Sequence, residues 1–181
     1  MPSEPFAIAF ANTRSSTHRD RIHTLTQWRA WVDAWPGLRP AGYAVDVDGL
    51  LALRATRDDL QLLLRAVAGG SRPEPMQLSE LTRSTPSLTV RWHADQLTLA
   101  VPDDGTAATV IGHHLTRAAI DLLLTGPPFA ACQGPDCLKL FVASRTGRRW
   151  CDSAVCGNRV RVRAHSDRNR HTDPPGPGQP G

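Results

Sequence analysis

The four cysteines of this chain fall within one 25-residue stretch near its C-terminal end. They form two Cys-x4-Cys pairs separated by 13 residues, and they are Cys132, Cys137, Cys151 and Cys156. Two short pairs joined by a loop long enough for a β-hairpin can place four thiolates at the corners of a tetrahedron. A structural zinc ion takes this coordination. The spacing therefore predicts one structural Zn²⁺.

Disulfides and unlinked thiols are the alternatives to a metal site. The start of the chain bears on this choice, because it indicates the compartment in which the cysteines lie. Glu4 stands where a secretory signal would carry a basic residue, and no apolar run approaches the roughly 20 residues that span a bilayer. We therefore expect a cytoplasmic protein without a membrane partner, in a compartment where clustered cysteines bind metal more often than they form disulfides. His165 is a weaker candidate ligand, because the fourth cysteine is already correctly spaced. Four thiolates leave no position for water, which argues against an enzyme with catalytic zinc.

Positive charge is concentrated around the cysteines. Residues 129–170 carry 9 Lys or Arg against 3 Asp, whereas residues 1–128 carry 12 Arg against 13 Asp or Glu. A local cationic cluster can neutralise phosphates, so we expect DNA contact. The candidate nucleic-acid-binding residues are Arg148, Arg149, Asn158, Arg159, Arg161 and Arg163. The alternatives are a solvated face that offsets thiolate charge, or a zinc knuckle that binds RNA or an acidic protein.

Of three residues beside the cysteines, two have two interpretations each and one has a single interpretation. Asn158 could read an adenine edge or hydrogen-bond the metal loop. Trp150 could belong to the core of a small module or stack on a base. Gly157 could allow the chain to approach the metal site closely.

The segment between the cysteine pairs predicts a β-hairpin over residues 138–150, with its turn at 145–147. Such a hairpin would bring Cys137 and Cys151 together at its base. After Asp152, a candidate N-cap, the chain can be read as a helix or a strand, and the cap favours a helix. In either case we expect one side to pack and the other to be cationic.

The N-terminal part predicts mainly helices with one β-hairpin, which makes the fold class α+β. Thr24 and Gln27 match a capping box at a helix start. Apolar spacing predicts helices over 24–35, 46–68 and 106–124, a short apolar element over 6–11, and a hairpin over 87–101.

Gly126-Pro127-Pro128 is the predicted domain boundary. It divides the chain into an N-terminal domain over 1–128 and a small C-terminal ββα-like zinc module over 129–170. The Pro- and Gly-rich residues 171–181 are expected to be disordered.

Two family resemblances follow from these motifs. The run Arg148–Cys151 and the run Cys156-Gly157-Asn158-Arg159 resemble the CGNR zinc-finger family over about residues 132–164. Asn12-Thr13, the Trp28 helix and Leu53-Arg54 are similar to the ABATE-type domain that accompanies this finger in bacterial stress-induced transcription regulators. The resemblance implies zinc binding, a DNA-binding role and an N-terminal domain that senses an unknown small-molecule effector.

Asn12, Thr13 and Arg54 could line a pocket in the N-terminal domain. A helix cap and an ion pair are the structural alternatives for these residues. A homodimer would extend the few base pairs that a single small finger reads, and the sequence leaves the oligomeric state open.

Overall fold

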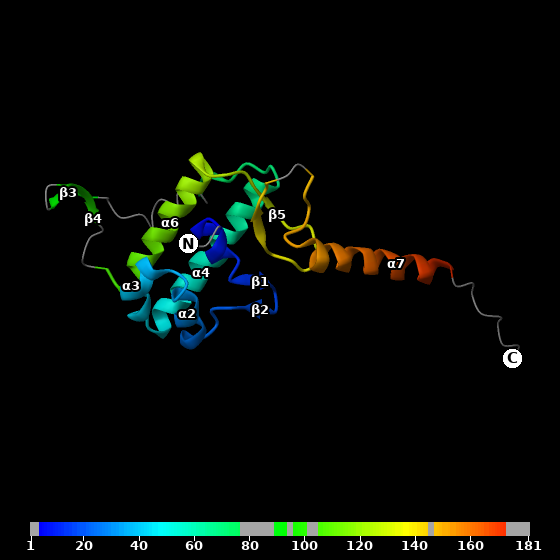
Figure 1. Ribbon diagram of the computed structural model, residues 1–181, viewed down its shortest axis with the longest axis horizontal. Coiled ribbons are helices and arrows are strands. Elements are labelled where there is room, and N and C mark those ends of the chain that lie inside the picture. Colours follow the sequence, from blue (N-terminus) through cyan, green and yellow to red (C-terminus); the bar gives the residue numbers. More distant parts are fainter. Residues whose placement is uncertain (1–3, 77–88, 94–95, 101–104, 145–146, 173–181) are drawn as a thin grey trace, which may run out of the picture.

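The N-terminal part of the chain is a bundle of helices. The computed structural model describes residues 4–76, 89–93, 96–100, 105–144 and 147–172. The helices that pack together are α1 (Phe6–Ala11), α2 (Leu25–Val32), α3 (Arg39–Tyr43), α4 (Val47–Ala68) and α6 (Ala107–Thr125) (Figure 1). A 3₁₀ turn, η1 (Pro36–Leu38), joins α2 to α3. Within the described ranges, no helix has the length and apolar character needed to cross a bilayer.

Side chains that accept hydrogen bonds from the first turn set the helix starts. The Thr24 hydroxyl accepts a hydrogen bond from the backbone N–H of Gln27, and the Gln27 side chain accepts one from the backbone N–H of Thr24. The predicted capping box is therefore confirmed. Asp46 and Thr106 cap α4 and α6 in the same way. Helix α2 ends at Val32, three residues before its predicted end. Proline clashes with the carbonyl four residues earlier, and Pro36 lies four residues after Val32.

The main core lies between α2, α4 and α6. Trp28, Leu53 and Ile111 are buried there at the positions that helical spacing predicted. Trp28 and Trp31 stack with 5.5 Å between ring centroids. The tryptophans of α2 therefore act in packing, as expected from their spacing.

Two hairpins extend from the helical part. Strands β3 (Thr89–His93) and β4 (Gln96–Ala100) pair antiparallel, as predicted, and the expected turn at 94–95 lies outside the described residues. Strands β1 (Arg14–Ser16) and β2 (Arg19–Asp20) form a hairpin that the sequence pattern did not indicate. It is short and polar, so it lacks the apolar alternation that identifies a strand.

The C-terminal module begins with strand β5 (Phe129–Ala131), which pairs with β6 (Leu140–Val142). Leu140 is 1% exposed and belongs to a second core with Ile8 of α1 and Leu60 of α4. The module thus rests on the N-terminal helices through the apolar side of its own small sheet.

The predicted hairpin over 138–150 is wrong. Strand β6 pairs with β5, which precedes it, and residues 148–150 form no strand. Instead, the carbonyl of Arg149 accepts a 3.0 Å hydrogen bond from the N–H of Gln133 in the first cysteine loop. The turn at 145–146 lies outside the described residues.

Helix α7 (Asn158–Thr172) ends the described chain and points away from the helical bundle (Figure 1). The preference for a helix after Asp152 is confirmed. The expectation that one side of this segment packs holds only at its start, where Cys156 is buried and Val160 is half-buried, and is wrong beyond it, because all residues from 161 to 168 are exposed. The helix also continues two residues into the predicted disordered tail, of which 173–181 lie outside the described residues.

Candidate metal centre and cationic surface

The four cysteine Sγ atoms converge on one point. They lie within 4.8 Å of one another, and three of the four residues are buried. The Cys137–Cys151 and Cys151–Cys156 Sγ distances are 3.8 and 3.7 Å. A tetrahedron with Zn–S bonds of about 2.3 Å has edges of about 3.8 Å, whereas a disulfide would bring two sulfurs to about 2.05 Å. The cluster therefore fits one structural zinc ion.

The first cysteine loop is shaped by Gly134. A Cβ added there would lie 2.9 Å from Cys156 Cβ and 3.2 Å from Cys156 Sγ, so only glycine fits. A turn closes the loop, because the N–H of Cys137 donates to the carbonyl of Gly134 at 3.2 Å. Asp136 holds the third turn position at φ 57°, as in a type II turn with proline before it. The loop therefore folds back so that Cys132 and Cys137 face one point.

Backbone N–H groups point at one of the sulfurs. Gly134 and Cys151 donate to Cys132 Sγ at 3.4 and 3.3 Å. Such bonds offset the negative charge of a coordinating thiolate and fix its orientation.

The second cysteine pair is closed by a single π-helical turn, η2 (Ser153–Gly157). The Asp152 carboxylate accepts from the N–H groups of Ala154 and Val155 at 2.8 and 3.0 Å. Asp152 is therefore the cap that the sequence predicted, and it positions Cys156 on the last turn before α7 begins.

Without a cation beside them, the four thiols do not all lose their protons readily. Burial raises the pKa of the Cys156 thiol to about 11, and it also raises the pKa of the Cys151 thiol. Burial also acts to raise the pKa of Cys132, but the hydrogen bonds from the two N–H donors and from the Cys137 and Cys151 thiols together outweigh it and lower this pKa. A divalent cation supplies the charge that four adjacent thiolates need, and its binding releases protons.

Arg148 and Arg149 contact the module itself. The Arg148 guanidinium lies 4.5 Å from the Phe141 ring centroid and donates to the carbonyls of Trp150 and Cys151. Arg149 lies 4.9 Å from the Trp150 ring. Arg148 therefore braces the segment that carries the third cysteine, a role that its position in a basic run did not reveal.

Trp150 packs against the cysteine cluster, which agrees with its interpretation as core. Gly157 faces this ring, since a Cβ there would lie 3.4 Å from it. The close approach that we expected toward the metal is instead an approach toward Trp150.

The remaining predicted contact residues lie on the first turns of α7. Asn158, Arg159, Arg161 and Arg163 are all exposed. Among the described residues, the Asn158 side chain forms no hydrogen bond, so it does not brace the metal loop. Arg161 folds back toward Gly157, because its Nη1 would lie 3.6 Å from a Cβ there.

A recess of about 300 Å³ lies at the base of α7. Arg19 from the β1–β2 hairpin, Lys139 before β6 and Arg159 from α7 all line it. Arg19 and Lys139 were not among the predicted contact residues. Lys139 is the one lysine of the sequence and sits between the cysteine pairs, a signal that could have found it; no local signal marks Arg19.

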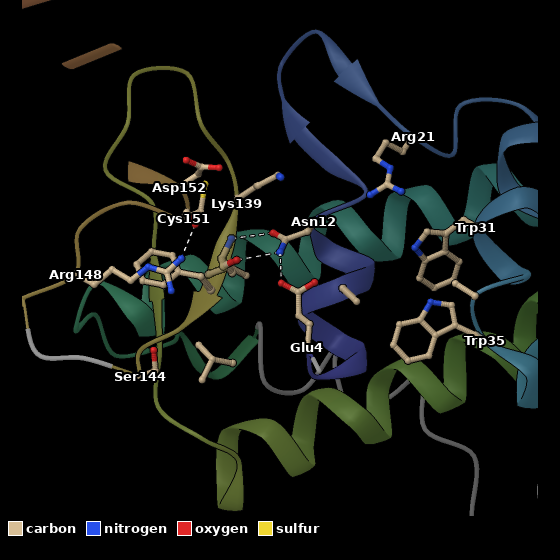
Figure 2. A pocket seen from close by; sticks show the side chains of 15 residues that line it. Glu4, Asn12, Arg21, Trp31, Trp35, Lys139, Ser144, Arg148, Cys151 and Asp152 are labelled. Carbon is tan, nitrogen blue, oxygen red and sulfur yellow. Dashed lines mark hydrogen bonds between the residues drawn. The ribbon is translucent and has the colours of Figure 1, made fainter. Parts of the chain in front are cut away.

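The three residues predicted to share an N-terminal pocket are not brought together. Thr13 is buried, and its hydroxyl donates to the carbonyl of Phe10. Arg54 pairs with Asp20 at 3.1 Å. Asn12 lines a cleft against the zinc module, about 570 Å³ in volume (Figure 2).

Comparison with known families divides the chain in two. Residues 129–169 match the CGNR zinc finger, and residues 4–126 match ABATE, the family described as "Putative stress-induced transcription regulator". No curated protein matches the chain. Neither matched family is enzymatic by its description. The chain belongs to the ABATE family and carries a CGNR zinc finger that holds one structural zinc ion.

Proposed function

We propose that this protein regulates transcription by binding duplex DNA through its last helix. The observation that carries the proposal is the exposure of α7, where every residue from 161 to 168 faces solvent. An isolated helix of 15 residues is marginally stable in water. A helix that is mostly polar and leaves the body of the protein is suited to being covered by a polar partner.

The dimensions and charges of α7 suit a DNA groove. Its 15 residues span about 22 Å at 1.5 Å per residue, and the major groove of B-DNA admits one α-helix. Arg159 and Arg163 are four residues apart and share a face, while Arg161 lies between them on another face. A helix placed in the groove would therefore direct arginines toward the phosphates on both sides.

The recess at the base of α7 extends this surface. Arg19, Lys139 and Arg159 surround it, so one DNA phosphate could be contacted from the N-terminal domain and from the zinc module together. Arg148 would add positive charge while its guanidinium stays on Phe141. Arg149 and Asn158 lie exposed at the same end of the surface.

Charge reversal on α7 tests the proposal. We expect the R161E/R163E variant to lose duplex binding, with a salt dependence lower by about two units of slope for two lost phosphate contacts. The matched control is R29E/R72E, which changes the same charge at two exposed arginines of the N-terminal part. Both variants should keep one zinc per chain, since neither pair touches a cysteine.

Binding is measured by fluorescence anisotropy on a pool of duplex fragments, with single-stranded RNA as competitor. Equal duplex affinity in the two variants would overturn the DNA interface. Tighter binding of the RNA than of the duplex would instead favour the RNA-binding alternative.

A further inference from the structure

The cleft between the N-terminal helices and the zinc module has the size of a small-molecule site. Its volume of about 570 Å³ falls in the range of about 300–1,000 Å³ typical of ligand pockets. Figure 2 shows Glu4, Arg21 and Trp35 on the N-terminal side and Lys139 and Arg148 on the module side. An occupant would touch both parts of the protein at once.

Two cations of this cleft lack a partner. In the described ranges, the side chains of Arg21 and Lys139 form no ion pair and no hydrogen bond. Both line the cleft together with Glu4. Burial raises the pKa of Glu4, and the charges of Lys139 and Arg21 lower it by less. Glu4 instead accepts a 2.9 Å hydrogen bond from Asn12. The two cations are thus available to an anionic group from outside.

One wall of the cleft is aromatic. The rings of Trp31 and Trp35 lie 5.8 Å apart, and Phe6 meets Trp35 edge-on at 4.7 Å. Phe141 lies on the opposite side beneath Arg148. Planar apolar groups pack well against such rings.

We propose that this cleft binds a small organic anion with a planar apolar body. The acid group, a carboxylate or a phosphate, lies between Arg21 and Lys139, and the body packs against Trp31 and Trp35. Of the pocket expected at Asn12, Thr13 and Arg54, only Asn12 lines this cleft. The cleft shares Lys139 with the proposed DNA surface, but its occupancy is measured on the protein alone, without DNA.

Glu4 decides which class of ligand fits. A carboxylate beside the acid group repels an anion, so the Glu4→Gln variant should bind anions more tightly. A ligand held by its ammonium group would show the opposite change, because Glu4 would be its partner.

The test follows the indole N–H signals of ¹⁵N-labelled tryptophan by NMR in the zinc-loaded full chain, assigned with Trp31→Phe and Trp35→Phe. The probes are benzoate, phenyl phosphate and L-phenylalanine. We expect saturable shifts of Trp31 or Trp35 with benzoate or phenyl phosphate, and the tighter of the two identifies the acid group. The R21Q/K139Q variant should bind about tenfold more weakly or worse, and the R29Q/R117Q control should be unchanged.

Three outcomes would overturn the proposal. They are the absence of a saturable shift with either anion, equal affinity in R21Q/K139Q and the control, and tighter binding of L-phenylalanine than of benzoate. Loss of DNA binding in another variant would bear on the proposed function without touching this site.

Discussion

The side-chain amide of Asn12 pairs with both backbone groups of Leu140, 128 residues away in the sequence. Its nitrogen donates to the Leu140 carbonyl at 2.9 Å, and its oxygen accepts from the Leu140 N–H at 2.8 Å. Asn12 thus completes the hydrogen bonding of a buried residue in β6 from the end of α1. It is one of several polar links between the ABATE domain and the zinc module, beside the bond from the Leu138 N–H to the Ser15 carbonyl at 3.0 Å.

Replacing this amide should be costly. Asn12→Ala leaves the N–H and C=O of Leu140 buried without partners, which should lower the free energy of unfolding by about 2–4 kcal/mol. Urea unfolding of the zinc-loaded protein measures it. Asn158→Ala is the control, because that side chain is exposed and should change stability by less than about 0.5 kcal/mol. Similar values for the two variants would contradict the role of Asn12.

Gly134→Ala should weaken zinc binding. The added methyl group would press on Cys156 and displace the N–H that donates to Cys132, so we expect an affinity lower by about tenfold or more. Competition with a chromogenic chelator measures this. Gly37→Ala is the matched control, because nothing lies within 4 Å of a Cβ at that position. If both variants bind zinc alike, the first cysteine loop does not need glycine.

Asp20 makes stability depend on pH. It pairs at 2.7 Å with Arg57, which is 1% exposed. Burial raises the pKa of Asp20, but the hydrogen bonds from Arg57 and from the Ile22 N–H and the charges of Arg57 and Arg54 together outweigh burial and lower it. A lowered pKa stabilises the fold above the unfolded-state value of about 3.9, and this contribution is lost as the pH falls through the folded-state pKa.

Asp20→Asn should therefore lower the free energy of unfolding by about 3 kcal/mol near neutral pH. The difference in unfolding free energy from wild type should become smaller below about pH 4. Loss of zinc in acid affects both proteins and cancels in the difference. Asp121→Asn, in an exposed pair with Arg117, is the control and should change the free energy of unfolding near neutral pH by less than about 0.5 kcal/mol. A deficit for Asp20→Asn that does not change with pH would exclude this linkage.

Arg19→Gln should weaken duplex DNA binding and lower the salt slope by about one unit, because one phosphate contact is lost from the N-terminal hairpin. Arg29→Gln, on α2, serves as the control. An unchanged affinity for Arg19→Gln would confine the interface to the zinc module and leave the proposal for α7 intact.

Features that depend on neighbouring residues were predictable from sequence. The Thr24–Gln27 capping box and the four converging cysteines each follow from spacings of a few residues or a short loop. Helical spacing likewise identified Trp28, Leu53 and Ile111 as core.

Features that depend on contacts between distant parts of the chain were not predictable from the sequence. The pairing of β5 with β6 was missed because Phe129–Ala131 is too short to show alternation, and a local hairpin over 138–150 satisfied the same pattern. The Asn12–Leu140 bonds join residues whose separation no local pattern encodes. Arg148 was interpreted as a DNA contact because its stacking on Phe141 becomes visible only once the module is folded.

The central claim is that one zinc ion held by four thiolates shapes the surface that carries α7. Cobalt(II) substitution tests it most directly, combined with metal analysis of the zinc form and of Cys156→Ser. We expect one metal per chain, sulfur-to-cobalt charge-transfer bands with the visible spectrum of a tetrahedral site, and loss of helical circular dichroism when metal is removed. A freshly reduced protein that binds no metal, or that keeps all its helical signal without metal, would contradict the account.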